Sequence, residues 1–117
     1  MHELAIAEAV IGIASDHAAG RPVRAVFVKV GHLRQVVPAA LEFSFELAAR
    51  GTPVDGARLD IEHVPVAGIC RLCGREDALD AFPLACRACG ALDVTVTQGE
   101  ELHVDSLELD DEMAVTA

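Results

Sequence analysis

The chain has 117 residues, of which 52% are hydrophobic, and its nine basic and nineteen acidic side chains give a formal net charge of −10 at pH 7. This length suits one domain of ordinary size or a small domain with a smaller insert, and the apolar content excludes a disordered chain. The negative charge repels phosphate backbones and anionic lipid, so we expect neither nucleic acid nor a membrane as a partner. No apolar run approaches the length of about 18 residues that a membrane span needs.

The first half of the chain alternates between helix and strand patterns. Apolar residues at three- and four-residue steps predict a helix over residues 4–19. The residues expected on its apolar face are Ile6, Val10, Ile13 or Ala14, and His17. Alternating valines predict a strand over residues 23–30, and Pro38 marks the start of a second helix that ends near Arg50. The residues expected in the wide apolar stripe of this second helix are Leu41, Phe43, Phe45, Leu47 and Ala48.

Strand patterns dominate the second half of the chain. Apolar and charged residues alternate over residues 57–66, which predicts a second strand. A strand pattern returns over residues 94–109 and is interrupted near Gly99. Within this last stretch, the apolar residues before and after residues 105–106 are out of phase, so we expect a bulge there.

All four cysteines lie between these strands, in two pairs of the form CxxCG. The four residues are Cys70, Cys73, Cys86 and Cys89. Two residues between the cysteines of a pair let one tight turn direct both sulfurs at one ion, and the glycine after each pair can take the positive φ that such a turn needs. The twelve residues between the pairs are too few for a core, so a metal would stabilise this segment. Four soft thiolates in tetrahedral geometry suit a structural Zn²⁺ ion.

Two alternatives to zinc use the same cysteines. The first is a pair of disulfides, which need an oxidising compartment. The N-terminal segment has acidic residues where an export signal is basic, so we expect a cytoplasmic protein with reduced thiols. The second is an iron site of the rubredoxin kind, which the spacing leaves open.

The order of these elements predicts an α+β fold. We expect a small three-stranded sheet with two helices, because the connection from the first strand through the second helix suits a crossover that packs on a sheet. The two CxxCG knuckles would form an inserted zinc-ribbon-like module. The expected division is an α+β domain made of residues 1–66 and 95–117, and a zinc-binding domain made of residues 67–94.

The chain resembles the HypA/HybF family of hydrogenase nickel-incorporation proteins over nearly its whole length. The segments that carry the resemblance are Met1-His2-Glu3, Gly31 with Pro38-Ala39-Ala40-Leu41-Glu42-Phe43 and Phe45-Glu46, the two CxxCG knuckles, and Gln98-Gly99-Glu100-Glu101-Leu102 with Ser106-Leu107-Glu108-Leu109. Their order and spacing together make the resemblance specific. Arg87 stands where the second knuckle of the family often has proline, which leaves the four ligands intact.

The resemblance implies a nickel metallochaperone, not an enzyme, that helps to load Ni²⁺ into [NiFe] hydrogenase. It implies a GTPase partner of the HypB type and a hydrogenase large-subunit precursor as partners, and it places nickel at Met1, His2 and Glu3, within the α+β domain. The chemistry of this segment agrees, because the terminal amine, the backbone nitrogen of His2 and its imidazole can chelate one cation in fused rings. The amide nitrogen or the carboxylate of Glu3 would add a fourth donor. A monomer and a homodimer both remain open.

Two other function classes fit parts of the sequence. A nucleic-acid-binding zinc ribbon is favoured by three arginines near the knuckles and opposed by the net charge and by the presence of only four aromatic residues. A rubredoxin-like electron carrier would hold iron in place of zinc.

The four remaining histidines show no ligand pattern, and nothing in the sequence pairs His32, which lies in a loop, with another ligand. These four histidines are His17, His32, His63 and His103.

Overall fold

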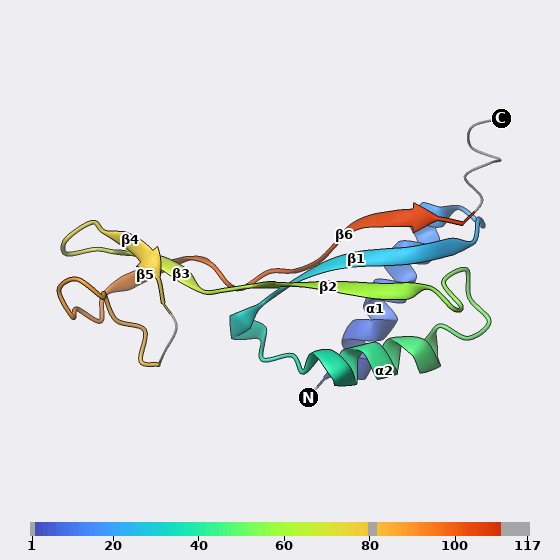
Figure 1. The fold of residues 1–117 in the computed structure, drawn as a ribbon, viewed down its shortest axis with the longest axis horizontal. Coiled ribbons are helices and arrows are strands. Elements are labelled where there is room, and N and C mark those ends of the chain that lie inside the picture. The colour runs from blue at the N-terminus through green and yellow to red at the C-terminus, as the bar shows by residue number, and fades with distance from the viewer. Residues whose placement is uncertain (1, 80–81, 111–117) are drawn as a thin grey trace. The chain divides into compact units, whose positions relative to one another are not determined.

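The computed structural model describes residues 2–79 and 82–110 of the chain (Figure 1). In chain order, the elements of these residues are α1 (Glu3–Ala18), β1 (Val23–Gly31), the 3-10 helix η1 (His32–Arg34), α2 (Pro38–Ala48), β2 (Arg58–Val64), β3 (Ala67–Cys70), β4 (Glu76–Ala78), β5 (Val94–Gln98) and β6 (Leu102–Leu109). The strands form two three-stranded sheets, with the orders β2-β1-β6 and β4-β3-β5. The predicted α+β class, with two helices, a small sheet and a zinc-ribbon-like module, is therefore confirmed for the described residues.

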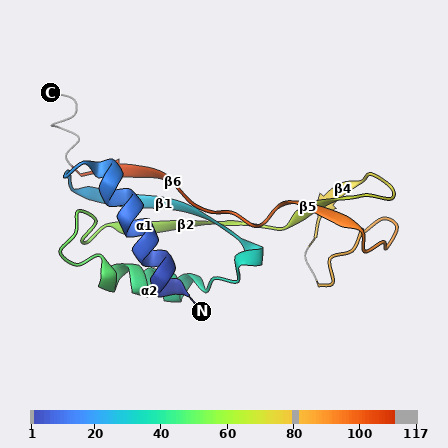
Figure 2. The same cartoon turned by 180° about the vertical axis from the view of Figure 1, so that it is seen from behind.

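The described residues divide into two compact units. The first unit contains residues up to 29, residues 36–62 and residues from 103 onward, and the second contains residues 30–35 and 63–102. In the first unit, α1 and α2 pack against each other, and Figure 2 shows α1 crossing one face of the β2-β1-β6 sheet. The buried apolar side chains of this unit come from both helices, the sheet and the loop before β2. They include Ala7, Val10, Ile11, Ala14, Val26, Val28, Leu41, Phe45, Val54 and Leu59.

The buried face of α1 differs from the one that its apolar pattern predicted. Its buried residues are Glu3, Ala7, Val10, Ile11, Ala14 and Ala18. Val10 and Ala14 were expected there, but Ile13 is 45% exposed and His17 is also exposed. Three alanines, Ala7, Ala14 and Ala18, lie on the buried face, and such small side chains let two packed elements approach closely. The prediction was therefore right for Val10 and for Ala14 as the alternative to Ile13, and wrong for His17.

The apolar stripe of α2 is narrower than predicted. Leu41 and Phe45 are fully buried or nearly so, and Ala49, just after the helix, continues the same face. Phe43 is 63% exposed and Leu47 is 42% exposed. At 3.6 residues per turn these two side chains lie on a different side of the helix from Leu41 and Phe45, and only one side of α2 meets the core.

Strand β1 lies at the centre of its sheet and pairs with β6 in the antiparallel sense. The N–H of Asp110 donates to the carbonyl of Pro22 at one end of the pairing, and the N–H of Gly31 donates to the carbonyl of Glu101 at the other. On β6, Asp105 and Ser106 are both exposed, which breaks the alternation where the sequence predicts a bulge. The bulge itself stays a prediction.

The second sheet holds the cysteine segment. β3 pairs antiparallel with both β4 and β5, and Cys70 at the end of β3 lies opposite Val94 at the start of β5. Gly68 allows this close pairing, because a Cβ at this position would lie 2.6 Å from the Val94 Cγ1 atom and 2.9 Å from the Thr95 carbonyl oxygen. The sequence showed β5 and β6 as one interrupted strand, but the break at Gly99 is also a change of sheet.

The position of β5 bears on the expected division of the chain. The sequence placed residues 95–98 in the α+β domain, whereas β5 pairs with β3 in the second sheet. The roles expected of the two domains, one for nickel and one for zinc, stay predictions.

Among the described residues, neither helix combines the length and the apolar character needed to cross a membrane.

Candidate metal centre

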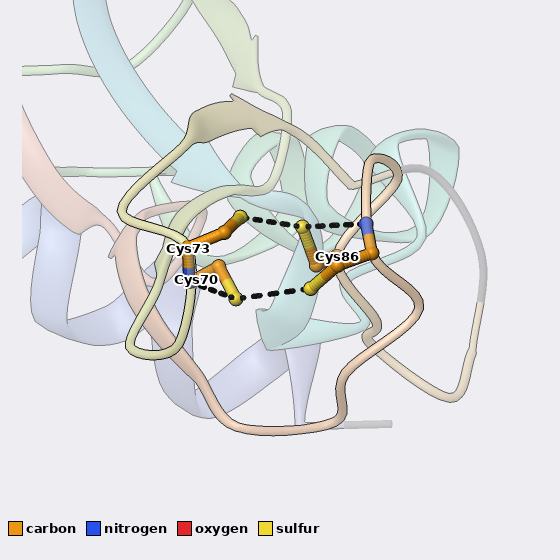
Figure 3. Close-up of side chains that lie close together, drawn as sticks. Cys70, Cys73 and Cys86 are labelled. Carbon is orange, nitrogen blue, oxygen red and sulfur yellow. Dashed lines mark hydrogen bonds between the residues drawn. The ribbon is translucent and has the colours of Figure 1, made fainter.

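The four cysteine sulfurs meet at one point in the second unit. The Sγ atoms of Cys70 and Cys89 lie 3.7 Å apart, and those of Cys73 and Cys86 lie 3.5 Å apart (Figure 3). All four sulfurs lie within 4.8 Å of one another, and within the described part of the chain no other three His, Cys, Asp or Glu residues gather in this way. The thiols are free, and their separations are far longer than the S–S bond of about 2.05 Å. The cysteines are thus arranged to bind a metal.

The two knuckles repeat the same backbone geometry. The N–H of Gly74 donates to the carbonyl of Cys70 at 2.9 Å, and the N–H of Gly90 donates to the carbonyl of Cys86 at 2.8 Å. These glycines have φ values of 77° and 78°, as the sequence predicted. Within each turn, the N–H of the second cysteine lies 3.5 Å from the sulfur of the first, and this contact stabilises a thiolate there.

The pKa values of the thiols follow from these contacts. The N–H of Cys89 lowers the pKa of Cys86 to about 6, and the N–H of Cys73 likewise lowers the pKa of Cys70. The N–H of Ala91 acts to lower the pKa of Cys89, but the sulfurs of Cys70 and Cys86 outweigh it and raise that pKa to about 11.

The fourth thiol behaves like Cys89. The N–H of Arg75 acts to lower the pKa of Cys73, but the neighbouring sulfur of Cys86 and burial prevail and raise it. In each knuckle, therefore, the first cysteine has a lowered pKa and forms a thiolate readily. The second has a raised pKa, because a thiolate there would be repelled by the neighbouring sulfurs. A cation at the centre would remove this repulsion, so the donor set fits a divalent ion that prefers thiolate.

Hydrogen bonds around the knuckles hold this arrangement in place. The backbone N–H of Arg71 donates to the carbonyl of Asp93, and its guanidinium donates to the hydroxyl of Thr95 at 2.9 Å. The same guanidinium lies 3.4 Å from the Asp93 carboxylate. Arg75 lies 3.2 Å from the carboxylate of Asp77. Two of the arginines that would favour nucleic acid are thus already paired with carboxylates.

Two of the predicted nickel residues, His2 and Glu3, lie at the start of α1, in the first unit. Met1 is outside the described residues. His2 is exposed and is the N-cap of α1, where its carbonyl accepts a hydrogen bond from the N–H of Ile6 at 3.0 Å. Glu3 is only 7% exposed, and its Oε2 atom accepts a hydrogen bond from the backbone N–H of Val37 at 3.1 Å. The sequence did not predict this inward position of the carboxylate.

The structure also brings together two histidines that the sequence left unpaired. The rings of His32 and His63 have their centroids 5.3 Å apart and meet edge to face. His32 follows β1 and His63 lies on β2, the neighbouring strand in the sheet. The spacing of residues along the sequence cannot show a contact between two histidines so far apart in the chain, because the contact depends on how the two strands pair.

Comparison with known sequences identifies one family along almost the entire chain. The HypA family model, described as hydrogenase/urease nickel incorporation, metallochaperone, matches residues 1–109. The chain is 48% identical over 110 residues to the hydrogenase maturation factor HypA of Geotalea uraniireducens, covering 94% of this chain and all of that protein. It is 35% identical over 111 residues to the HypA of a Nostoc species, covering 95% of this chain and 97% of the relative.

Comparison with solved structures gives the same result. The solution structure of the Ni metallochaperone HypA from Helicobacter pylori matches with a TM-score of 0.66 and 25% identity, over 92% of this chain and 96% of that one. A second solution structure of a HypA protein matches with a TM-score of 0.68 and 26% identity, over 93% and 96% of the two chains. Sequence and fold therefore agree across both units.

Proposed function

Because the chain belongs to the HypA family of nickel-incorporation metallochaperones, we propose that it binds Ni²⁺ at Met1, His2 and Glu3 and delivers it during hydrogenase maturation. The observation that carries this proposal is the exposed position of His2 at the N-cap of α1. An exposed imidazole next to the chain terminus can reach an ion that arrives from solvent, and it can release the ion to a partner.

The backbone of the first helical turn favours the same chelate. The first N–H groups of an α-helix have no carbonyl partner within the helix, so deprotonating the amides of His2 and Glu3 breaks no helical hydrogen bond. The Met1 amine, these amide nitrogens and the His2 imidazole form a nitrogen-rich donor set that suits square-planar Ni(II). The Glu3 carboxylate accepts the Val37 N–H, and we propose the amide nitrogen of Glu3 as the fourth donor.

Zinc is the ion that best fits the four-cysteine site. The convergent sulfurs match a closed tetrahedral Cys₄ site, and Cys70, Cys73, Cys86 and Cys89 would hold the ion. Bound there, zinc supplies a structural crosslink between the two knuckles and no redox chemistry. Iron in the same sulfurs would give a coloured protein, so metal analysis of the purified protein decides between the two ions.

Delivery requires partners, and we propose a HypB-type GTPase and the large-subunit precursor of a [NiFe] hydrogenase, in the cytoplasm. The formal charge of −10 favours capture of cations and of basic partner surfaces. Leu4 and Val37 are each more than half exposed on the first unit, on either side of the hydrogen bond from Val37 to Glu3. We place the partner contact on this surface around the start of α1, where it would cover the ion during transfer.

Isothermal titration of Ni²⁺ into zinc-loaded, untagged protein tests the nickel site. We compare the native chain, a chain extended by three residues before Met1, and the His2→Ala variant. The extension moves the amine out of the chelate ring and the substitution removes the imidazole, so both should weaken binding while the zinc content stays constant. Affinity in the native chain should also fall as the pH is lowered from about 8, because the nitrogen donors bind nickel only after they lose their protons. Equal affinity in all three proteins would refute the site.

A further inference from the structure

We propose that His32 and His63 form a second metal site, separate from the N-terminus and from the cysteines, for a divalent ion of the Ni²⁺ class. The two residues belong to the second compact unit, whereas the proposed nickel residues belong to the first. The proposal therefore goes beyond the N-terminal site and does not depend on it.

The spacing of the two rings fits a shared ion. Two imidazole nitrogens that bind one ion at about 2.1 Å place their ring centres roughly 5 Å apart. The observed centroid separation is 5.3 Å, with an angle of 81° between the ring planes. The present edge-to-face contact needs only ring rotation to direct one nitrogen of each ring at the ion. Both side chains are exposed, and exposed side chains change rotamer within nanoseconds.

The backbone that carries His32 is held on both sides of the residue. The N–H of Gly31 donates to the carbonyl of Glu101 at 2.7 Å, and the N–H of Leu33 donates to the carbonyl of Gly99 at 2.8 Å. The guanidinium of Arg34 donates to the carbonyl of Glu100 at 2.7 Å. A side chain at Gly31 would overlap the backbone of Gly99, so glycine is what permits this close approach. His32 is therefore presented from a fixed turn.

The segment after His63 is anchored to the same stretch of chain. The side-chain amide of Gln98 donates to the carbonyl of Pro65 at 3.0 Å. The backbone of Val66 packs against Gly99, which has a φ of 114°. The carbonyl of Val66 accepts a hydrogen bond from the N–H of Leu79. Both histidines are thus held through residues 98–101, so the two imidazoles are close together before an ion arrives, and binding need not fix their backbones.

The donor type selects the class of ion. Imidazole suits Zn²⁺, Cu²⁺, Fe²⁺ and Ni²⁺, whereas Mg²⁺ and Ca²⁺ prefer oxygen. Zn²⁺ is expected at the four thiolates of the cysteine site instead. Two exposed imidazoles leave the remaining positions of the ion to water, so the ion is held weakly and exchanges readily. Such a site would act as a holding position for Ni²⁺ on the second unit.

NMR with Ni²⁺ tests the pair directly. The sample is the zinc-loaded chain extended by three residues before Met1, in which the amine lies too far from His2 to share a chelate with it. Paramagnetic Ni²⁺, added below one equivalent, should broaden the imidazole signals of His32 and His63 together. The signals of His17 and His103 should stay sharp and serve as controls within the same molecule.

Three variants of the extended chain complete the test. His32→Ala and His63→Ala should each abolish the broadening at the remaining partner, and the control His103→Ala should leave it unchanged. Zinc content and the amide spectrum confirm that the fold is retained in each variant. Equal broadening of His103 and His32, or unchanged broadening of His63 in His32→Ala, would overturn the proposal. Because the extended chain lacks the N-terminal chelate, this result does not depend on whether the N-terminal site exists.

Discussion

The carboxylate of Glu3, on the first turn of α1, accepts a hydrogen bond from the backbone N–H of Val37, the residue that precedes α2. The contact resembles the part of a capping box in which a glutamate reaches the N–H of an N-cap residue, but here the glutamate comes from another helix. It also places a negative charge at the positive end of the α2 dipole. One residue therefore links the proposed nickel segment to the packing of the two helices.

Separate substitutions at Glu3 distinguish its structural role from a role as a nickel ligand. Glu3→Ala removes the acceptor for the Val37 N–H and should lower the melting temperature of the zinc-loaded chain, because a donor near a helix start loses its partner. Glu3→Gln keeps an acceptor oxygen and should bind Ni²⁺ with native affinity, because in the proposed site the donor from Glu3 is its amide nitrogen and not its carboxylate. Calorimetry gives both quantities. A Glu3→Gln protein with native melting temperature but no nickel binding would show that the carboxylate binds the ion.

Each of the four cysteines should be necessary for zinc in the second unit. We expect Cys73→Ser to lower the bound zinc and to disorder the β4-β3-β5 sheet, while the amide signals of α1 and α2 persist because the first unit has its own core. Elemental analysis and an amide NMR spectrum measure the two effects. Leu72→Ser, at an exposed position of the same knuckle, is the matched control and should retain zinc. Full zinc content in Cys73→Ser would contradict the site.

Zinc binding should release protons from the two thiols whose pKa values are raised. At about pH 8, Cys86 with its pKa of about 6 is already a thiolate, whereas Cys73 and Cys89 are protonated and must lose their protons to bind. Zinc affinity should therefore rise with pH in this range and fall more steeply below about pH 6, where Cys86 also becomes protonated. Titrations in two buffers of different ionisation enthalpy count the protons. Release of fewer than two protons per zinc at about pH 8 would contradict these pKa directions.

Two glycine substitutions should change stability in opposite directions. At Gly68 a new Cβ would meet the Val94 side chain and the Thr95 backbone, so Gly68→Ala should destabilise the chain by about 1–3 kcal/mol. Gly12 lies on α1 with no atom near its would-be Cβ, so Gly12→Ala should stabilise the chain by about 0.5–1 kcal/mol. Denaturant unfolding of the zinc-loaded proteins measures both. A stable Gly68→Ala protein would mean that β3 and β5 are packed less closely than described.

The features that local chemistry determines could be read from the sequence. The CxxCG spacing and its glycine define each knuckle within five residues, and Pro38 marks the first residue of α2 because its missing N–H costs nothing there. The buried face of α1 could not be read in the same way. Ala7, Ala14 and Ala18 are buried because a neighbouring element approaches closely, and helical periodicity alone does not contain that information.

Other features depend on which strands pair. The change of sheet between β5 and β6 was hidden because both strands alternate and only Gly99 separates them. The contact between His32 and His63 follows from the pairing of β1 with β2 across the α2 crossover, and no motif records it. The inward carboxylate of Glu3 likewise depends on the position of α2. Chemistry that is shared between distant segments therefore became visible only in the folded chain.

The central claim is that the N-terminal segment binds nickel through nitrogen, and nickel X-ray absorption of the untagged, zinc-loaded protein with less than one equivalent of Ni²⁺ tests it most directly. We expect a planar shell of nitrogen donors with an imidazole contribution and no sulfur, because the cysteines are occupied by zinc. Three residues added before Met1 should change this spectrum, and His2→Ala should remove the imidazole contribution. A nickel shell that contains sulfur, or a spectrum that is the same in all three proteins, would contradict the claim.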